Sequence, residues 1–333
     1  MPGVDGVIAT VVEHPLAQAY PPPVKHQLRF LKVWLEKLER DGTFDCSELY
    51  ERIAVLVAGN TDAADWCYKS YWLSEAAAIT LHESTKMVST GTTGLCTWDG
   101  ALVLAEWELA NIRFFEGKTV VELGSGIGLA GILLAKGCKP SRVVLTDHLH
   151  DVLEALRTNI ALNKVTAEVQ HLDWTDGDAA VESLAEVAPD VMVASDIVFD
   201  PGLCSALASV INGVLTAATK RCELYISSTV RNPATLVQFV AELRGHGLVV
   251  TPKRLDAVPQ LFPRTDSFPV EFHHVVTAAQ AAITATAAVE ELHGEVGAGA
   301  GAGAGASTGS DGGSYAVEVG RYGAKADAVD AAD

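Results

Sequence analysis

A glycine-rich turn that joins an apolar strand to a helix is the feature that most constrains the fold of this chain. Gly124, Gly126 and Gly128 follow the apolar strand expected at 120–123 and lead into the helix expected at 127–136. Glycine allows a tight turn and a close approach of the backbone to a ligand. A strand, turn and helix of this kind are typical of doubly wound α/β sheets, in which ligands bind beyond the carboxyl ends of the strands.

Short β-rich runs alternate with helical stretches on both sides of this turn, which predicts a parallel sheet with helices on both faces. Two late β-rich runs, near 247–256 and 269–277, have no long helix between them and therefore predict one antiparallel strand. Together the elements predict an α/β protein with the seven-stranded Rossmann-like fold of class I methyltransferases. The other strands are expected at 142–146, 168–172, 190–194 and 223–228, and the other helices at 149–162, at 202–218 and after the capping Asn232.

Composition divides the chain into three regions. Residues 1–90 are expected to be a small, mainly helical N-terminal region, because leucines repeat at helical spacing from Leu28 to Leu38 and Asp45 is placed to cap a second helix. Residues 91–277 carry the strand–helix alternation. Residues 278–333 are rich in alanine and glycine and are acidic, which predicts a disordered tail without a catalytic role.

Acidic side chains stand at the ends of three successive predicted strands. Glu122 ends the first strand, where a carboxylate suits a cofactor with a sulfonium and a free amino group. Asp147 ends the second strand, where it can accept hydrogen bonds from two ribose hydroxyls. Asp173 and Trp174 follow the third strand, where the carboxylate can accept from an adenine amino group and the indole offers an apolar face. The pattern therefore predicts S-adenosylmethionine as the cofactor.

Charge and cysteine content exclude several other classes of function. A net charge of −18 repels phosphate backbones, so we expect a protein partner and no nucleic acid. The sequence contains neither a signal-peptide pattern nor a stretch of about 18 apolar residues, so we expect no contact with membranes. The six cysteines form no Cys-x-x-Cys pair and no zinc spacing, which predicts reduced thiols, a cytoplasmic location and no metal site. We expect a monomer.

Several runs in the predicted domain resemble the seven-strand lysine methyltransferases, a family that carries an acid-x-x-aromatic motif after its fourth strand. Two further runs, and the region around His14 to Lys25, resemble the branch of that family that modifies eukaryotic elongation factor 2. The likeness covers roughly residues 12–276. The family runs are Gly91-Thr-Thr-Gly-Leu-Cys-Thr-Trp98-Asp99, Glu122 to Gly128, Leu172-Asp173-Trp174 and Asp196-Ile197-Val198-Phe199, and the branch runs are Thr229-Val230-Arg231-Asn232-Pro233 and Leu261-Phe262-Pro263.

The resemblance implies a function and a set of cofactor contacts. The chain would be a protein-lysine N-methyltransferase that uses S-adenosylmethionine and acts on elongation factor 2. Trp98 would contact the cofactor, and Trp174 would lie against the adenine. Gly124, Ser125 and Gly126 would cradle the amino-acid part of the cofactor, Gly128 would also belong to the cofactor site, and Ser195 would line the same pocket.

Asp196 and Phe199 are the candidate catalytic residues. A lysine ammonium has no lone pair, so it must lose a proton before the methyl group can be transferred. We hypothesise that Asp196 accepts a hydrogen bond from the incoming amine and orients it, and that Phe199 forms one wall of the lysine channel. The alternative is structural, with Asp196 capping the next helix and Phe199 packed in the core.

Other functions remain open at this stage. Gly126, Gly128 and Gly131 match the dinucleotide fingerprint, so a dehydrogenase is a rival, although it gives no role to Glu122 or Trp174. A methyltransferase of another protein, of a small molecule or of a nucleic acid is a second alternative, and a silent cofactor-binding interaction protein is a third. The target lysine and the number of methyl groups added do not follow from the sequence.

Overall fold

A seven-stranded sheet forms the centre of the computed structural model, which describes residues 8, 12–42, 45–59, 65–74, 77–89, 91–265, 267–283 and 286. The strand order is β5-β4-β3-β6-β7-β9-β8. Strand β9 runs antiparallel to both of its neighbours, and the other pairs are parallel. The predicted seven-stranded fold with one antiparallel strand is therefore confirmed. The strands are β3 Thr119–Leu123, β4 Arg142–Asp147, β5 Glu168–His171, β6 Val191–Ser195, β7 Glu223–Thr229, β8 Leu248–Pro252 and β9 Val270–Thr277.

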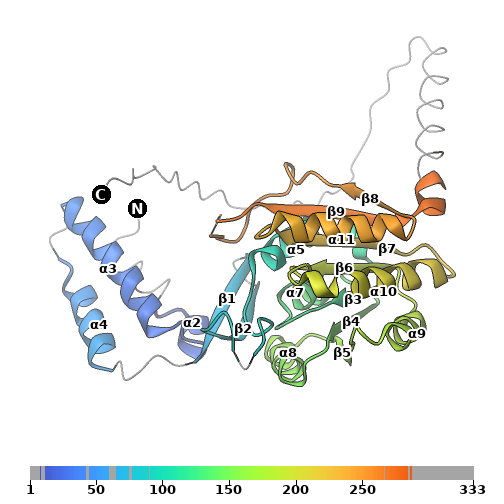
Figure 1. Ribbon diagram of the computed structural model, residues 1–333. Coiled ribbons are helices and arrows are strands. Elements are labelled where there is room, and N and C mark those ends of the chain that lie inside the picture. The colour runs from blue at the N-terminus through green and yellow to red at the C-terminus, as the bar shows by residue number, and fades with distance from the viewer. Residues whose placement is uncertain are drawn as a thin grey trace, which may run out of the picture.

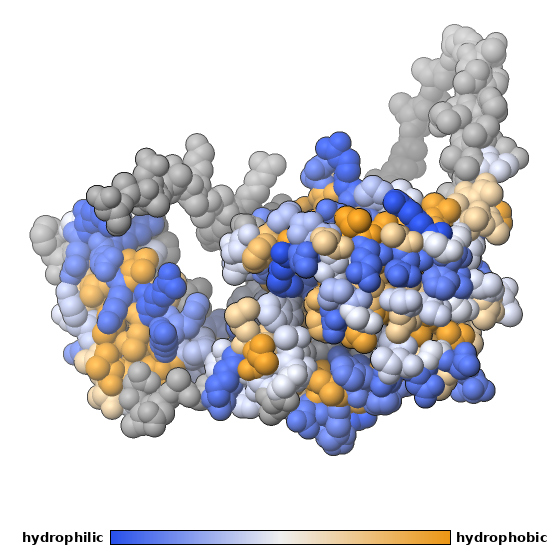
Figure 2. Space-filling view, in the orientation of Figure 1, coloured by the Kyte–Doolittle hydropathy of each residue, from blue (hydrophilic) through white to orange (hydrophobic). Residues whose placement is uncertain are grey.

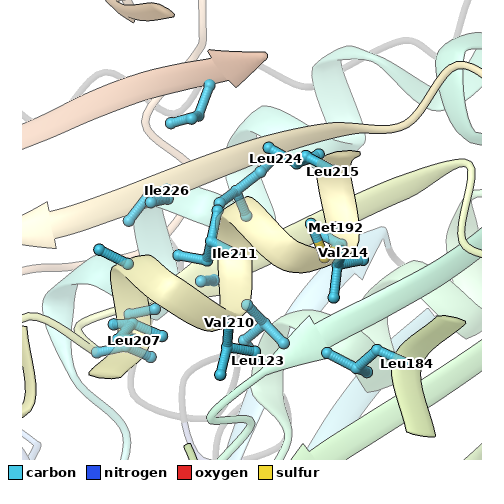
Figure 3. Close-up of a cluster of buried hydrophobic side chains, with 14 of the residues drawn as sticks. Leu123, Leu184, Met192, Leu207, Val210, Ile211, Val214, Leu215, Leu224 and Ile226 are labelled. Atoms are coloured by element: carbon cyan, nitrogen blue, oxygen red, sulfur yellow. The ribbon is translucent and has the colours of Figure 1, made fainter. Parts of the chain in front are cut away.

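Helices cover both faces of this sheet (Figure 1). On one face α9, α10 and α11 pack on side chains such as Leu123 and Met192, and Figure 3 shows the core between them. On the other face α5, α6, α7 and α8 pack on Val120 and Val193. Because successive residues of a strand point to opposite faces, each buried strand contributes side chains to the hydrophobic layers on both sides of the sheet. The helices are α5 Asp99–Ala110, α6 Ile112–Phe115, α7 Leu129–Gly137, α8 His150–Asn163, α9 Gly177–Val187, α10 Cys204–Ala217 (after the short 3-10 turn Pro201–Leu203) and α11 Pro233–Gly245.

The N-terminal region contains the two expected helices, α3 Val24–Arg40 and α4 Ser47–Ala58, and also a short helix that was not predicted, α2 Pro15–Ala19. Helix α3 ends at Arg40, and the carboxylate of Asp45, the predicted cap, accepts from the amide of Ser47 in the first turn of α4. Leu31, Leu35 and Leu49 bury one another in a cluster that shares no residue with the two layers of the central sheet. Helices α3 and α4 therefore pack mainly on each other, and in Figure 1 they stand apart from the central sheet.

Residues 66–74 and 77–84 correct the expectation that region 1–90 is mainly helical. They form a β-hairpin of β1 Trp66–Ser74 and β2 Ala77–Ser84, which lies between the N-terminal helices and the central sheet in Figure 1. Tyr71 and Leu73 face the core of the domain, whereas Trp72 lies on the opposite face of β1. Because aromatic residues occupy both faces, the alternation typical of a half-buried strand is hidden in the sequence.

The tail also differs in part from its prediction. Residues 278–283 are helical and continue directly from β9, although they were assigned to the disordered segment. The rest of that prediction, apart from Thr286, lies outside the described residues. No long apolar helix capable of crossing a membrane occurs within the described ranges.

Two asparagines of α8 attach the hairpin to the domain. The side chain of Asn163 accepts from the amide of Thr80 at 2.9 Å and donates to its carbonyl at 2.7 Å. Asn159 bonds the amide and carbonyl of His82 at 2.8 and 3.2 Å, and its amide also donates to the carbonyl of Ile127 in the glycine turn. Residues four apart on a helix rise about 6 Å, close to the roughly 6.8 Å between alternate residues of a strand, so the two side chains replace a missing neighbouring strand.

Replacing Asn163 with alanine should destabilise the whole domain. The substitution leaves the buried amide and carbonyl of Thr80 without partners, at a cost of about 1–3 kcal/mol for each group. We expect the free energy of unfolding, measured by urea denaturation, to fall by roughly 2–4 kcal/mol. Asn212→Ala is the matched control, because that helical asparagine accepts a solvent-exposed bond from Thr216 and, among the described residues, makes no buried one. Equal losses of unfolding free energy in the two variants would contradict the role of Asn163 in attaching the hairpin to the domain.

Candidate active site

A pocket of about 340 Å³ opens at the carboxyl ends of the parallel strands, where doubly wound sheets bind ligands. Its volume lies within the range of ordinary small-molecule sites. The structure brings together all but one of the residues selected from the sequence. Those that line the pocket are Trp98, Gly124, Ser125, Gly126, Gly128, Asp147, Asp173, Trp174, Ser195, Asp196 and Phe199. The exception is Glu122.

The glycine turn follows β3 and has the backbone that its sequence predicts. Gly124, Gly126 and Gly128 have φ angles of +63°, +54° and +92°, in the left-handed region that glycine adopts without strain. A Cβ atom at Gly124 would lie 2.7 Å from a methyl group of Ile197, and one at Gly126 would lie 3.0 Å from the carbonyl oxygen of Gly94. Glycine is therefore required here both for the turn and for the space beside it.

Hydrogen bonds from β4 fix the turn in place. The backbone of Ser125 donates to the carbonyl of Thr146 at 2.8 Å, and its hydroxyl oxygen accepts from the Thr146 amide at 3.1 Å. Asp147 accepts from the amides of Gly126, at 3.2 Å, and of His148, at 2.8 Å. The Asp147 carboxylate thus stabilises the turn, and the contact predicted between it and a ribose stays a prediction.

Asp173 and Trp174 form a third side of the pocket. One carboxylate oxygen of Asp173 accepts from the amide and the hydroxyl of Thr175, at 2.8 and 2.7 Å, and these bonds lower the pKa of Asp173. The Trp174 ring lies about 3.4 Å from the position of a Cβ at Gly124. Among the described residues, the buried Nε1 of Trp174 has no hydrogen-bond acceptor.

These features fit S-adenosylmethionine, the cofactor predicted from the sequence. The glycine turn leaves a cradle that side chains would fill, and an indole face and two carboxylates border the same space. The unpaired Nε1 of Trp174 is a donor without an acceptor, which is uncommon in a buried site and is consistent with a polar ligand nearby. No group of three or more potential metal ligands occurs within the residues that the structure describes.

Glu122 does not line the pocket, which corrects its prediction as a cofactor ligand. Its side chain is 1% exposed and points beneath the glycine turn, where Oε2 accepts from the amide of Gly131 in α7 at 3.1 Å. Burial raises the pKa of Glu122 to about 8. The sequence position at a strand end was correct, but the alternation of side chains along β3 directs this one into the helix layer.

The buried Glu122 carboxyl should make stability fall as pH rises. Its folded pKa of about 8 exceeds the ordinary value of 4.5, so stability is full below pH 4.5 and decreases up to about pH 8 as the unfolded chain ionises first. Glu122→Gln keeps an acceptor for Gly131 without this ionisation. We expect the variant to gain stability relative to the wild type, by a few kcal/mol at most, between pH 5 and 8 in urea titrations.

Glu168→Gln is the control for this measurement. Glu168 is exposed, and its hydrogen bond from Arg142 lowers its pKa below the ordinary value. Its ionisation is therefore nearly complete in both states above about pH 6, and its substitution should give a constant difference in stability from there to pH 8. If the difference in unfolding free energy between Glu122→Gln and the wild type were equally independent of pH, the raised pKa assigned to the buried Glu122 would be overturned.

Asp196 ties three segments together at the pocket. Its carboxylate accepts from the amide of Thr229 at 2.6 Å, from the Thr229 hydroxyl at 2.9 Å and from the amide of Gly100 at 3.0 Å. The side chain is 7% exposed, with the guanidinium of Arg231 at 3.7 Å. Three of about four acceptor sites of the carboxylate are therefore used by the protein. Asp196 does cap a helix, but the helix is α5, whereas Asp200 caps the short turn that follows β6.

Phe199 lies at the mouth of the pocket and is 55% exposed, so the alternative that it packs in the core is wrong. Arg231, which the sequence analysis left without a role, stacks over Trp98 with its guanidinium carbon 4.5 Å from the ring centre. Segment 92–97 also lines the pocket beside Trp98. Arg231 and segment 92–97 both lie in runs that carry the family resemblance. That resemblance was the only indication in the sequence that they belong to the pocket.

Removing the Asp196 carboxylate should weaken cofactor binding as well as turnover. Asp196→Ala leaves two backbone amides and a hydroxyl without their acceptor, at a cost of about 1–3 kcal/mol for each buried group. We expect the affinity for S-adenosylhomocysteine, measured by calorimetry, to fall by about tenfold or more. Asp200→Ala is the control and should bind normally. Normal binding by Asp196→Ala with turnover lost would instead assign the carboxylate to the lysine amine alone.

Comparisons with known proteins show which family this chain resembles. A family model described as lysine methyltransferase matches residues 74–244. Human protein-lysine N-methyltransferase EEF2KMT is 36% identical over 257 residues, which cover 73% of this chain and 77% of the human protein. Its mouse counterpart is 32% identical over 293 residues, 84% of each chain. Protein-lysine N-methyltransferase EFM3 of Chaetomium thermophilum is 32% identical over 258 residues, 70% of this chain and 76% of that protein. These matches contradict the dehydrogenase alternative.

Proposed function

The chain belongs to the lysine methyltransferase family, and from that membership we propose that it transfers a methyl group from S-adenosylmethionine to a lysine of elongation factor 2. The observation that carries the proposal is the coincidence of a glycine-cradled pocket with 32–36% identity to proteins named protein-lysine N-methyltransferase EEF2KMT. The six cysteines are free thiols, which is consistent with a reducing, cytoplasmic compartment.

The cofactor, when bound, supplies a methyl group on a sulfonium. The residues of the pocket would hold it in one orientation: Trp174 would offer a ring face to the adenine, Asp173 would accept from the adenine amino group and Asp147 from the ribose. The glycine turn admits the amino-acid part because no side chain fills that space. Positioning of this kind is the main contribution of an enzyme to an in-line displacement at an activated carbon.

The lysine enters past Phe199, whose exposed ring forms one wall of the mouth. A ring face attracts the ammonium on entry. The amine must become neutral before it reacts, and Asp196 retains one acceptor site toward which it can be oriented. Asp196 thus acts first as the residue that shapes the mouth and second as an acceptor for the amine.

The charge and shape of the protein support a protein substrate. A net charge of −18 attracts a target lysine that lies among basic residues. Helices α3 and α4 pack on themselves and leave Val33, Val55 and Val57 exposed, and Figure 2 shows apolar side chains on this part of the surface. We assign these helices to substrate recognition, because they pack on their own cluster and other helices already cover both faces of the central sheet.

A radiolabelled methyl group tests the proposal directly. The purified chain is incubated with labelled S-adenosylmethionine and a eukaryotic cytosolic lysate from cells that lack the enzyme. We expect one labelled band at the size of elongation factor 2, because the pocket selects a lysine side chain on a protein. The band should disappear when the modified lysine is changed to arginine, and excess unlabelled cofactor is the control.

The other outcomes separate the alternatives. Label in a different protein would keep lysine methylation and reject elongation factor 2. No labelled protein, with calorimetric binding of S-adenosylhomocysteine intact, would favour a small-molecule substrate or a silent cofactor-binding protein. Absence of cofactor binding would reject the proposed function altogether.

A further inference from the structure

Segment 92–98 forms one wall of the pocket but belongs to no helix or strand. Its internal bonds are few: the amide of Gly94 donates to the hydroxyl oxygen of Thr92 at 3.0 Å, and the indole of Trp98 donates to the carbonyl of Thr93 at 2.9 Å. A segment of this kind keeps one shape only where neighbouring elements fix it.

The β1–β2 hairpin supplies the fixing contacts. The amide of Ser84 donates to the carbonyl of Leu95 at 2.7 Å. Glu83, which is 0% exposed, accepts with Oε2 from both the amide of Thr97, at 3.1 Å, and its hydroxyl, at 2.7 Å. Two donors of one residue therefore converge on a single carboxylate oxygen, directly before Trp98 in the sequence.

The charge of Glu83 is compensated on its other side. Its Oε1 forms an ion pair with the ammonium of Lys69, whose side chain is half exposed. A carboxylate in such buried surroundings is tolerated only with a partner, and charge-assisted hydrogen bonds are stronger than neutral ones. The pair therefore holds Thr97 more firmly than a neutral side chain would.

The hairpin is itself fixed to the opposite wall of the pocket. Asn159 bonds both the amide and the carbonyl of His82 in β2 and donates to the carbonyl of Ile127 in the glycine turn. One hairpin thus sets the position of segment 92–98 relative to the glycine turn. The 3.0 Å between the carbonyl oxygen of Gly94 and the Cβ position of Gly126 shows how closely these two walls approach.

We propose that Glu83 is a positioning residue for the cofactor, which acts through Thr97 to place Trp98 and the rest of segment 92–98 against the glycine turn. The proposal rests on the proposed cofactor, but it assigns a role in binding to the hairpin, which contains none of the recognised motifs. Glu83 itself does not line the pocket.

A conservative pair of substitutions at Thr97 tests the link. Thr97→Val removes the hydroxyl donor and keeps the shape, so we expect the Kd for S-adenosylhomocysteine in calorimetry to rise about five- to tenfold. Thr97→Ser keeps both donors and should recover most of that affinity. A structural role alone would lower the melting temperature of Thr97→Val without changing the Kd of the folded protein.

Glu83→Gln tests the carboxylate. The amide keeps one acceptor but loses the charge that pairs with Lys69, so we expect about a tenfold rise in Kd and in KM for the cofactor, with kcat at saturating cofactor within about twofold. Ser70→Ala is the matched control, because Ser70 bonds Thr80 at 2.9 Å on the other face of the same hairpin and should leave the Kd unchanged.

The outcomes distinguish this proposal from the proposed function. A wild-type chain that does not bind S-adenosylhomocysteine would reject the cofactor itself. A wild-type chain that binds, with Thr97→Val and Glu83→Gln binding as tightly as Ser70→Ala, would overturn the positioning role. If Glu83→Gln does not fold, the comparison of Thr97→Val with Thr97→Ser still decides the question.

Discussion

Carboxylates that accept hydrogen bonds from the backbone of distant segments are the interaction on which the pocket depends. Asp196 holds the first turn of α5 and the end of β7, and Asp147 holds the glycine turn. Glu83 holds the segment before Trp98 in the same way. The sheet places the strand ends, but the loops beyond them have few bonds of their own. Charged acceptors form stronger hydrogen bonds than neutral ones, so a few side chains suffice to fix the irregular part of the fold.

Because the loops depend on carboxylates from distant segments, the sequence could predict the sheet and the position of the pocket but not the contacts that fix the loops. The alternation of apolar runs predicted the seven-stranded sheet, and the turn from Gly124 to Gly128 predicted the position of the pocket. The hairpin at 66–84 was missed because Tyr71 and Trp72 place aromatic groups on both faces of one strand. Helix α5 was missed because it is buried on most sides and has no clear apolar stripe. A pattern within one segment cannot show donors that arrive from elsewhere in the chain, as they do at Asp196.

The acids of the sheet illustrate the same limit. Glu122 and Asp147 both stand near strand ends beside the glycine turn, and the sequence assigned both to the cofactor. The structure separates them, because Glu122 lies beneath the turn and bonds Gly131, whereas Asp147 lines the pocket. Burial raises the pKa of Glu122 and, in α5, that of Glu108. The region under the turn therefore combines an apolar core with acids that are most stable there when protonated.

The attachment of the hairpin to α8 also determines when it can form during synthesis. Thr80 bonds Asn163, which lies 83 residues later in the chain. At typical elongation rates of about 5–20 residues per second, Thr80 is added to the chain roughly 4–17 s before Asn163. During that interval the edge of β2 is unpaired, and an isolated two-stranded hairpin is at best marginally stable. Segment 92–98, the first wall of the pocket to be translated, therefore lacks its fixed support until α8 has been made.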